Sequence, residues 1–361
     1  MPETVALSKH SCPACGAQAE WHPGKQLLAC TYCGTESPYE IDAAGGIREI
    51  DLVRTLREMP EELRGWRAEK RTVRCQSCQA VSVFDPSRVG QNCEFCGSPE
   101  LINYDEIKAP TRPQSVLPFK VTEPEVRESL RRWFGSKWLA PSKLKKKALV
   151  DTVRGVYIPY WTFDAQVDCS WRAESGHYYY TTESFRDSDG RRRTRQVRHV
   201  RWRPAAGRLE QFFDDEPVPG TQGIPPEVLQ QIEPFPTRDL VPYDTAYLSG
   251  FIVEHYRVVL IDAARQSRES IERQLHALCG QRVPGDTYRN LAIEPRYSGE
   301  TFKHTLFPVW MLTYDYRNKS FQLAVNGYTG KIGGRYPKSF WKIFFLVAAA
   351  LALLVIIFMT G

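Results

Sequence analysis

The sequence predicts an α+β protein with two N-terminal zinc ribbons, a mixed α/β head that contains a duplicated antiparallel module, and one C-terminal transmembrane helix. Three observations predict this architecture: cysteines in four CxxC pairs, a repeated apolar-Pro-apolar-Trp segment, and an uncharged apolar run near the end of the chain. With 361 residues, 42% of them apolar and 12% aromatic, the chain can bury a sizeable core.

The expected domain boundaries follow from the same three features. They are a first ribbon at 1–40, a helical connector at 41–70, a second ribbon at 71–105, an α+β cytoplasmic domain at 106–335 and a transmembrane helix at 340–359. Within the connector, Ile50, Val53 and Leu56 follow helical spacing up to Pro60, which predicts a broken helix.

Eight of the ten cysteines form two clusters of the same design. Each cluster has two CxxC knuckles separated by fourteen residues. Four thiolates fill the tetrahedral shell of one Zn²⁺, so such an ion is structural and leaves no position for a catalytic water. A redox CxxC motif would stand alone in a βαβ unit and not in matched pairs. We expect two structural Zn²⁺ ions, one bound by Cys12, Cys15, Cys30 and Cys33 and one by Cys75, Cys78, Cys93 and Cys96.

The head is predicted to contain two amphipathic helices. Thr122 and Glu125 form a capping-box pattern, which predicts a helix that buries Val126 and Leu130 and ends at Gly135. A second helix is expected at 267–280, ended by a glycine. The two cysteines outside the clusters, Cys169 and Cys279, are expected to be small buried side chains.

An internal repeat lies in the predicted strands of the head. Val156–Phe163 and Thr305–Leu312 share the pattern apolar-Pro-apolar-Trp, and each leads into a strand pattern. The repeat predicts two related antiparallel modules. Because proline cannot donate a ladder hydrogen bond, we expect each of these strands to begin at a sheet edge or a bulge.

A basic hairpin is predicted between the two repeated segments. Strands at 177–185 and 195–202 flank the turn sequence Asp187-Ser-Asp-Gly190. Seven arginines lie between positions 191 and 203. The hairpin is therefore a candidate contact surface for an anionic partner.

Two interpretations of these arginines remain open. One is nucleic-acid binding through Arg192, Arg195 and Arg198, with the neighbouring tyrosines stacking on bases. The plainer interpretation is a solvated hairpin whose arginines pair with nearby carboxylates. The net charge of +6 is a mild excess that fits an anionic membrane surface or nucleic acid.

No catalytic motif emerges from the sequence. The chain has no Walker-type phosphate loop, no HExxH and no GxSxG. Asp214, Asp215 and Glu216 are three adjacent acids, for which a surface turn before Pro217 is a simpler interpretation than a cation site. We therefore expect the protein not to be an enzyme.

The segment from Ile343 to Met359 carries no charge, and with Phe340 and Trp341 it is long enough to cross a hydrocarbon core of about 30 Å. Basic residues immediately precede it, namely Lys331, Arg335, Lys338 and Lys342. By the positive-inside rule, we expect a tail-anchored protein of the bacterial inner membrane with its N-terminal head in the cytoplasm.

The order of motifs resembles a known family. After the two ribbons come GVYIPYWTFDA, FFDDEPVP, LVPYDTAYLSGFIVEHY, LFPVWMLTYDY and VNGYTGK, followed by the apolar end. This order is similar to that of the bacterial TFIIB-type zinc-ribbon membrane proteins, which carry primosomal protein N′-like or helicase-like labels. The resemblance implies a non-catalytic factor that works beside SPFH-domain and PspA-like proteins in envelope stress.

The sequence leaves two interpretations of the function open. The first is a membrane-anchored scaffold that recruits a cytoplasmic protein partner, of the SPFH-domain or PspA type, to the inner membrane. The alternative is a membrane-tethered nucleic-acid-binding protein that uses the second ribbon and the basic hairpin. The sequence does not identify the partner or the oligomeric state.

Overall fold

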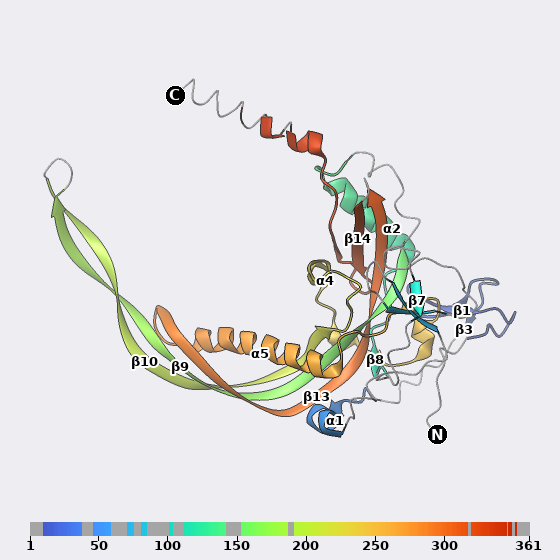
Figure 1. The fold of residues 1–361 in the computed structure, drawn as a ribbon, viewed down its shortest axis with the longest axis horizontal. Helices are drawn as coiled ribbons and strands as arrows, with labels where there is room; N and C mark the ends of the chain where they lie inside the picture. The colour runs from blue at the N-terminus through green and yellow to red at the C-terminus, as the bar shows by residue number, and fades with distance from the viewer. Residues whose placement is uncertain are drawn as a thin grey trace.

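Three very long strands form the frame of the molecule, which we describe from a computed structural model. They are β9 (Arg154–Arg186), β10 (Arg192–Pro219) and β13 (Thr287–Tyr316). They lie side by side in the order β10-β9-β13 and continue into β14 (Lys319–Asn326) and β15 (Ile332–Gly334) (Figure 1). The described residues are 10–37, 46–58, 71–75, 81–84, 101–103, 112–141, 153–186, 191–316, 319–344, 346–348 and 351.

Shorter elements surround this sheet. The short strands are β1 (Ala19–His22), β2 (Leu27–Cys30), β3 (Glu36–Ser37), β4 (Ile50–Asp51), β5 (Arg71–Cys75), β6 (Val81–Phe84), β7 (Leu101–Asn103), β8 (Ser115–Val116), β11 (Val241–Pro242) and β12 (Ile252–Val253). The helices are α1 (Leu52–Glu58), α2 (Glu123–Ser136), α4 (Pro226–Ile232) and α5 (Leu260–Arg282), with 3₁₀ turns at Thr237–Asp239 and Thr245–Leu248. The fold is thus mixed α and β, as predicted, and rich in strands.

Helix α5 lies in the concave side of the curved sheet (Figure 1). Its buried side chains Ile271, Leu275 and Cys279 pack against Val167 and Cys169 of β9. Both cysteines are fully buried with their Sγ atoms 3.9 Å apart, which confirms the prediction of burial. The helix is longer than predicted and continues beyond Gly280. That glycine does not end the helix but leaves room for the ring of Tyr288.

The two segments matched in the sequence lie next to each other. Val156 pairs with Val309 and Phe163 with Phe302, so Val156–Phe163 and Thr305–Leu312 run antiparallel at the centre of the sheet. Ile158 and Phe307 occupy the same position in the two segments, and they pair directly with each other. The segments are therefore related by a local twofold arrangement about this pair.

Contacts around the two segments recur at matching residues. The indole Nε1 of Trp161 donates to the Val258 carbonyl at 2.8 Å, and that of Trp310 donates to the Val121 carbonyl at 2.9 Å. An aromatic ring also lies edge-on to each indole at 5.0 Å, from Tyr256 on Trp161 and from Phe119 on Trp310. Equivalent hydrogen bonds and aromatic contacts therefore hold the two central tryptophans.

The head has two halves, one with β8, α2 and β9 and the other with β12, α5 and β13, and each half lends its short strand to the other. Strand β8, which precedes α2 and β9, pairs in parallel with β13, while β12, which precedes α5 and β13, pairs in parallel with β9. In both halves the helix begins seven positions after the short strand, at Glu123 after Val116 and at Leu260 after Val253. Each half therefore completes the sheet of the other.

The prediction that each repeated strand begins at an edge or bulge is wrong. Pro159 and Pro308 lie inside strands that have partners on both sides. The Pro159 carbonyl accepts from Gly220 N and the Pro308 carbonyl from Gly327 N, both at 2.8 Å. Because the N–H and C=O of a strand residue point to the same side, each missing N–H faces the place where one neighbouring strand gives way to another, β12 to β10 at Pro159 and β8 to β14 at Pro308.

A buried ion cluster replaces the predicted surface turn at 214–216. Asp215 is buried at a bulge of β10, and its carboxylate lies 2.6 Å from the Nζ of buried Lys303 on β13. Asp164 accepts from the Asp215 N–H at 2.7 Å and from the Thr301 hydroxyl at 2.8 Å. Glu49 contacts Lys303 at 3.3 Å and thereby ties the segment before β4 to the sheet.

Burial raises the pKa of Asp215, and Lys303 opposes that rise. Burial acts to lower the pKa of Lys303, but the hydrogen bond to Asp215 and the charges of Asp215, Asp164 and Glu49 together outweigh it and raise the pKa above its usual value. The ammonium ion is thus held charged inside the protein by the carboxylates around it.

Replacing Trp161 by Phe should lower the free energy of unfolding by about 1–3 kcal/mol, because the part-buried Val258 carbonyl loses its donor. Trp310→Phe should cost a similar amount through the Val121 carbonyl. Denaturant unfolding of the full chain measures both effects. Trp138→Phe, at a residue 57% exposed, is the control and should change stability by less than about 0.5 kcal/mol. A large loss of stability in Trp138→Phe, without one in the Trp161 and Trp310 variants, would contradict the role given to the two indole hydrogen bonds.

Lys303→Met should destabilise the protein by about 3–5 kcal/mol, because it leaves the buried carboxylate of Asp215 without its cation. Arg172→Met is the matched control. It removes the ion pair with Glu294 between β9 and β13, in which the two side chains are 74% and 66% exposed, and should cost at most about 1 kcal/mol. Thermal or denaturant unfolding distinguishes the two, and equal losses would show that burial of the cluster is not decisive.

Candidate metal centre

Four cysteines meet at the base of the β1–β2 hairpin. Cys12 and Cys15 precede β1, Cys30 ends β2 and Cys33 follows it. Their Sγ atoms all lie within 4.8 Å of one another, so the cluster can hold one Zn²⁺ ion. The structure thus confirms the cysteine cluster predicted near the N-terminus.

Glycine turns shape both knuckles. Gly16 and Gly34 adopt φ values of +72° and +71°, which favour glycine, and their N–H groups donate to the carbonyls of Cys12 and Cys30. Backbone N–H groups also point at sulfur, from Ala14 to Cys12 at 3.4 Å and from Cys33 to Cys30 at 3.5 Å. Such amides stabilise thiolates around a metal ion.

The thiols have unequal proton affinities. Hydrogen bonds from the hydroxyl and the backbone of Thr35 lower the pKa of Cys33 to about 6. The backbone N–H of Cys15 is the main cause of a lowered pKa at Cys12. The backbone of Ala17 acts to lower the pKa of Cys15, but its three cysteine neighbours and burial raise it to about 12. Crowded thiols therefore compete for negative charge, and a bound cation relieves that competition.

The cysteine-bearing hairpin is part of the main core. Ala19, Trp21 and Leu28 share one face of the hairpin and are buried with Phe119 and Tyr247. The backbone joins as well: Trp21 N donates to the Ser249 carbonyl at 3.0 Å, and the Ser249 hydroxyl donates to the Ala19 carbonyl at 2.6 Å. Sequence reasoning treated the ribbon as a tethered module and missed this docking. The apolar alternation of Ala19 and Trp21 was the available signal.

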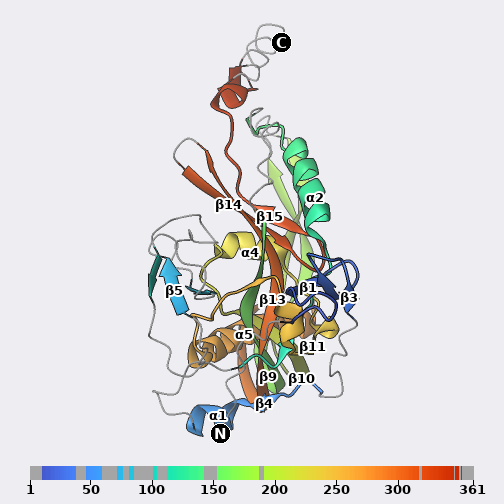
Figure 2. The same cartoon turned by 90° about the vertical axis from the view of Figure 1, so that its right-hand side faces the viewer.

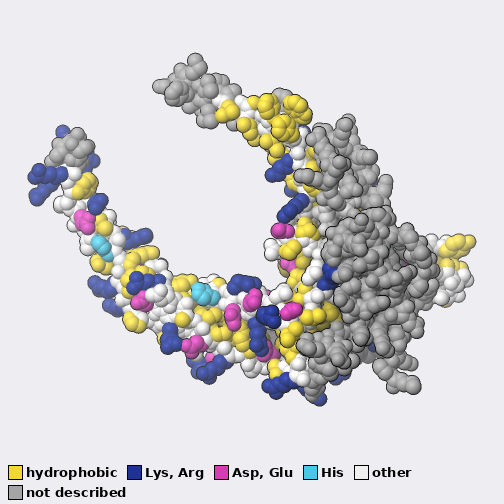
Figure 3. Space-filling view, viewed as in Figure 1, with side chains coloured by type: hydrophobic (Ala, Val, Ile, Leu, Met, Phe, Trp, Pro, Cys, Tyr) yellow, Lys and Arg dark blue, Asp and Glu magenta, His cyan; other side chains and the backbone are white. Residues whose placement is uncertain are grey.

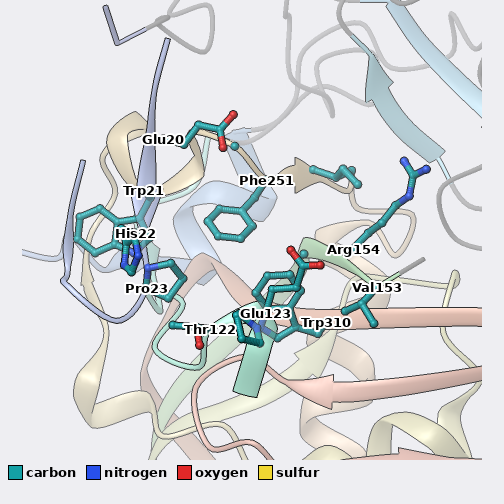
Figure 4. A pocket seen from close by; sticks show the side chains of 14 residues that line it. Glu20, Trp21, His22, Pro23, Thr122, Glu123, Val153, Arg154, Phe251 and Trp310 are labelled. Carbon is teal, nitrogen blue, oxygen red and sulfur yellow. The ribbon is translucent and has the colours of Figure 1, made fainter. Parts of the chain in front are cut away.

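A cavity of about 420 Å³ lies where the hairpin meets the head (Figure 4). Glu20, Trp21 and His22 line it from the hairpin, while Phe251 and Trp310 line it from the head. Figure 4 shows Glu123, at the start of α2, with its carboxylate directed toward Phe251. The lining combines aromatic rings with carboxylates, and Glu123 already pairs with Arg127.

The second predicted ribbon is described only in part. Strands β5, β6 and β7 form an antiparallel three-stranded sheet in the order β6-β5-β7. Cys75 ends β5, whereas Cys78, Cys93 and Cys96 lie outside the described residues. The expectation of a second Zn²⁺ ion at these cysteines therefore stays a prediction.

The three arginines proposed for nucleic-acid contact all lie on β10. They are exposed but do not share one face of the hairpin, because side chains alternate along a strand. Arg192 and Arg198 point to one face and Arg195 to the other. Of the carboxylates expected to pair with the arginines, Glu183 contacts Arg195 at 3.2 Å, and Asp187 and Asp189 lie outside the described residues.

The predicted transmembrane segment lies mostly beyond the described residues. Among the helices that the structure describes, none combines the length and hydrophobicity that a membrane crossing requires. Residues 340–344, 346–348 and 351 are helical, and Phe340 and Trp341 are 67% and 62% exposed. Lys342 donates to the carbonyls of Trp138 and Ala140, both at 2.8 Å, which fixes the start of the segment to the head. Figure 2 shows this segment at the opposite end of the molecule from α1.

Comparison with known proteins yields one distant relative and no functional assignment. A scan against protein-family models finds no match, and no solved structure matches the chain. The "Uncharacterized protein YdjG" of Bacillus subtilis (strain 168) is 25% identical over 252 residues, which are 66% of this chain and 68% of that protein. The similarity extends over most of both chains, but the name of the relative states no activity.

Replacing Cys15 and Cys33 by Ser should lower the zinc content of the purified full chain by one ion per molecule. It should also lower the midpoint of thermal unfolding, because the cysteine-bearing hairpin supplies Trp21 to the core. Atomic emission and calorimetry measure the two effects. Cys169→Ala, which removes a buried thiol outside the cluster, should leave the metal content unchanged. Equal zinc content in the double variant and the unmodified chain would contradict a metal centre here.

Proposed function

We propose that the protein is a non-catalytic, membrane-anchored zinc-ribbon scaffold that recruits a cytoplasmic protein partner to the bacterial inner membrane. One observation carries this proposal: the cysteine-bearing hairpin is fixed to the head through the buried face of its strands, while residues of both knuckles stay exposed. Pro13 and Ala14 of the first knuckle and Tyr32 of the second are exposed, and Tyr32 is 84% exposed.

The exposed knuckles suit protein recognition. A tyrosine held on a metal-fixed turn loses little conformational entropy on binding, and tyrosines are enriched among the residues that dominate interface energies. The described residues 10–37 contain one lysine and no arginine, and that lysine, Lys25, pairs with Glu36. A protein surface is a better match for such a tip than a phosphate backbone. The family resemblance suggests a partner of the SPFH-domain or PspA type.

The membrane anchor is supported by the end of the chain. The described part of this segment exposes a row of large apolar side chains, namely Phe340, Trp341, Phe344, Leu346, Val347 and Leu351. Exposed apolar surface of this extent favours contact with lipid or protein. The charge-free run from Ile343 to Met359 and the basic residues before it favour a spanning helix with the head in the cytoplasm.

Tyr32→Ala should reduce capture of the partner at least tenfold without changing the zinc content. The side chain makes an exposed contact surface and none of the described hydrogen bonds to the head. The measurement uses tagged full chain, extracted from native membranes after nuclease treatment and compared by quantitative mass spectrometry. Deletion of 1–105 is a poor substitute, because Trp21 and Leu52 belong to the core.

Tyr180→Ala is the matched control, since Tyr180 is 60% exposed on a different part of the molecule. It should retain the partner. The scaffold proposal would be wrong if both variants captured the same proteins as the unmodified chain, or if the chain were recovered in the soluble fraction of lysed cells.

A further inference from the structure

The strands β9 and β10 extend beyond the rest of the sheet as a two-stranded arm. Strand β13 begins opposite Gly176, so residues 177–186 and 192–201 pair only with each other among the described residues. Ten residues of strand span about 33 Å. Figure 1 shows this arm projecting away from the head, with both of its faces uncovered by other described elements.

The arm holds most of the net charge of the protein. Residues 177–201, which are the arm and its turn, contain seven arginines and three acids, a balance of +4, whereas the whole chain has +6. Figure 3 shows Lys and Arg side chains along the arm and gathered near its tip. The remaining 336 residues carry only +2, and a polyanion would meet its strongest attraction at the arm.

Aromatic rings hold several of these arginines in place. The guanidinium carbon of Arg198 lies 4.4 Å from the ring centroid of Tyr178, that of Arg201 lies 5.4 Å from Tyr179, and that of Arg195 lies 5.6 Å from Phe185. Each pair joins the two strands diagonally, so the stacks also stabilise a hairpin that has no core of its own. The charges are ordered before any partner arrives.

The arginines occupy both faces of the arm. Strand alternation and the register place Arg186, Arg192 and Arg198 on one face and Arg193, Arg195 and Arg201 on the other. A flat lipid surface would be met by one face only. A groove of double-stranded nucleic acid has phosphates along both walls, and the major groove admits a two-stranded β-ribbon.

We propose that the arm binds double-stranded nucleic acid by entering a groove, with arginines of both faces on the phosphates of the two walls. Phosphate contacts position a protein without reading sequence, so the binding is independent of base sequence. This activity is separate from the scaffold role, because it uses neither the ribbon tip nor the membrane anchor.

The test measures binding of full chain in nonionic detergent to a fluorescent 20-base-pair DNA duplex by anisotropy, over a series of salt concentrations. Two variants remove equal charge from opposite faces: Arg192→Gln with Arg198→Gln, and Arg195→Gln with Arg201→Gln. Groove binding predicts that each makes the slope of log K against log salt shallower by about 2, since each phosphate contact accounts for about 1. A duplex of scrambled sequence should bind equally well.

Two controls separate charge from folding and position. The same four arginines changed to Lys keep the charge, so these variants should bind with the slope of the unmodified chain even though stacking is weaker. Arg132→Gln with Arg273→Gln removes two exposed arginines from α2 and α5 and should leave binding unchanged.

Three outcomes would overturn the proposal. The first is an absence of salt-dependent duplex binding. The second is a loss confined to one face, as expected for a flat surface. The third is binding to phosphatidylglycerol vesicles without binding to the duplex, which would assign the arm to lipid headgroups.

Discussion

The antiparallel pairing of β9 with β13 about Ile158 and Phe307 is the constraint on which the rest of the structure depends. It sets the two central tryptophans on opposite sides of one local axis, and each then fixes the loop that follows a short strand. The cysteine-bearing hairpin packs near Trp310, while Leu52 of α1 packs near Trp161. The N-terminal segment therefore contacts both halves, with the cysteine-bearing hairpin on one and a strand and helix on the other.

Sequence patterns predicted what depends on neighbours in the chain. Knuckle spacing predicted the cluster at Cys12–Cys33, the Thr122–Glu125 capping box predicted the start of α2, and the repeated Pro-x-Trp pattern marked the strands at the centre. Side-chain partners far apart in sequence were missed. Nothing near Asp215 in the sequence indicates that Lys303 will pair with it. The sequence therefore predicted a surface turn where the structure has a buried acid. The tripeptides Phe119-Lys-Val and Tyr256-Arg-Val are similar and follow β8 and β12, so they could have indicated that these two short strands are equivalent.

Charge divides the molecule into regions with different chemistry. Inside the sheet, Lys303 is paired with Asp215 and Glu49, so its charge contributes to the fold. On the arm, arginines stack on aromatic rings and stay exposed. On the second knuckle of the cysteine-bearing hairpin, the ring of Tyr32 is exposed. The contacts proposed with a protein, a polyanion and a membrane therefore lie at separate places on the chain.

The exchange of short strands has a consequence for how the chain is made. The hydroxyl of Ser115 in β8 hydrogen-bonds to that of Thr305, 190 positions later. Strand β9 likewise pairs with β12 and β13, which come much later in the chain. Contacts of such long range slow folding, because a large loop must close before they form. On the ribosome, the first half therefore emerges with an open sheet edge that only the second half can cover. Until synthesis is nearly finished, the nascent head therefore keeps an unpaired strand edge, a kind of surface that favours aggregation when it is exposed.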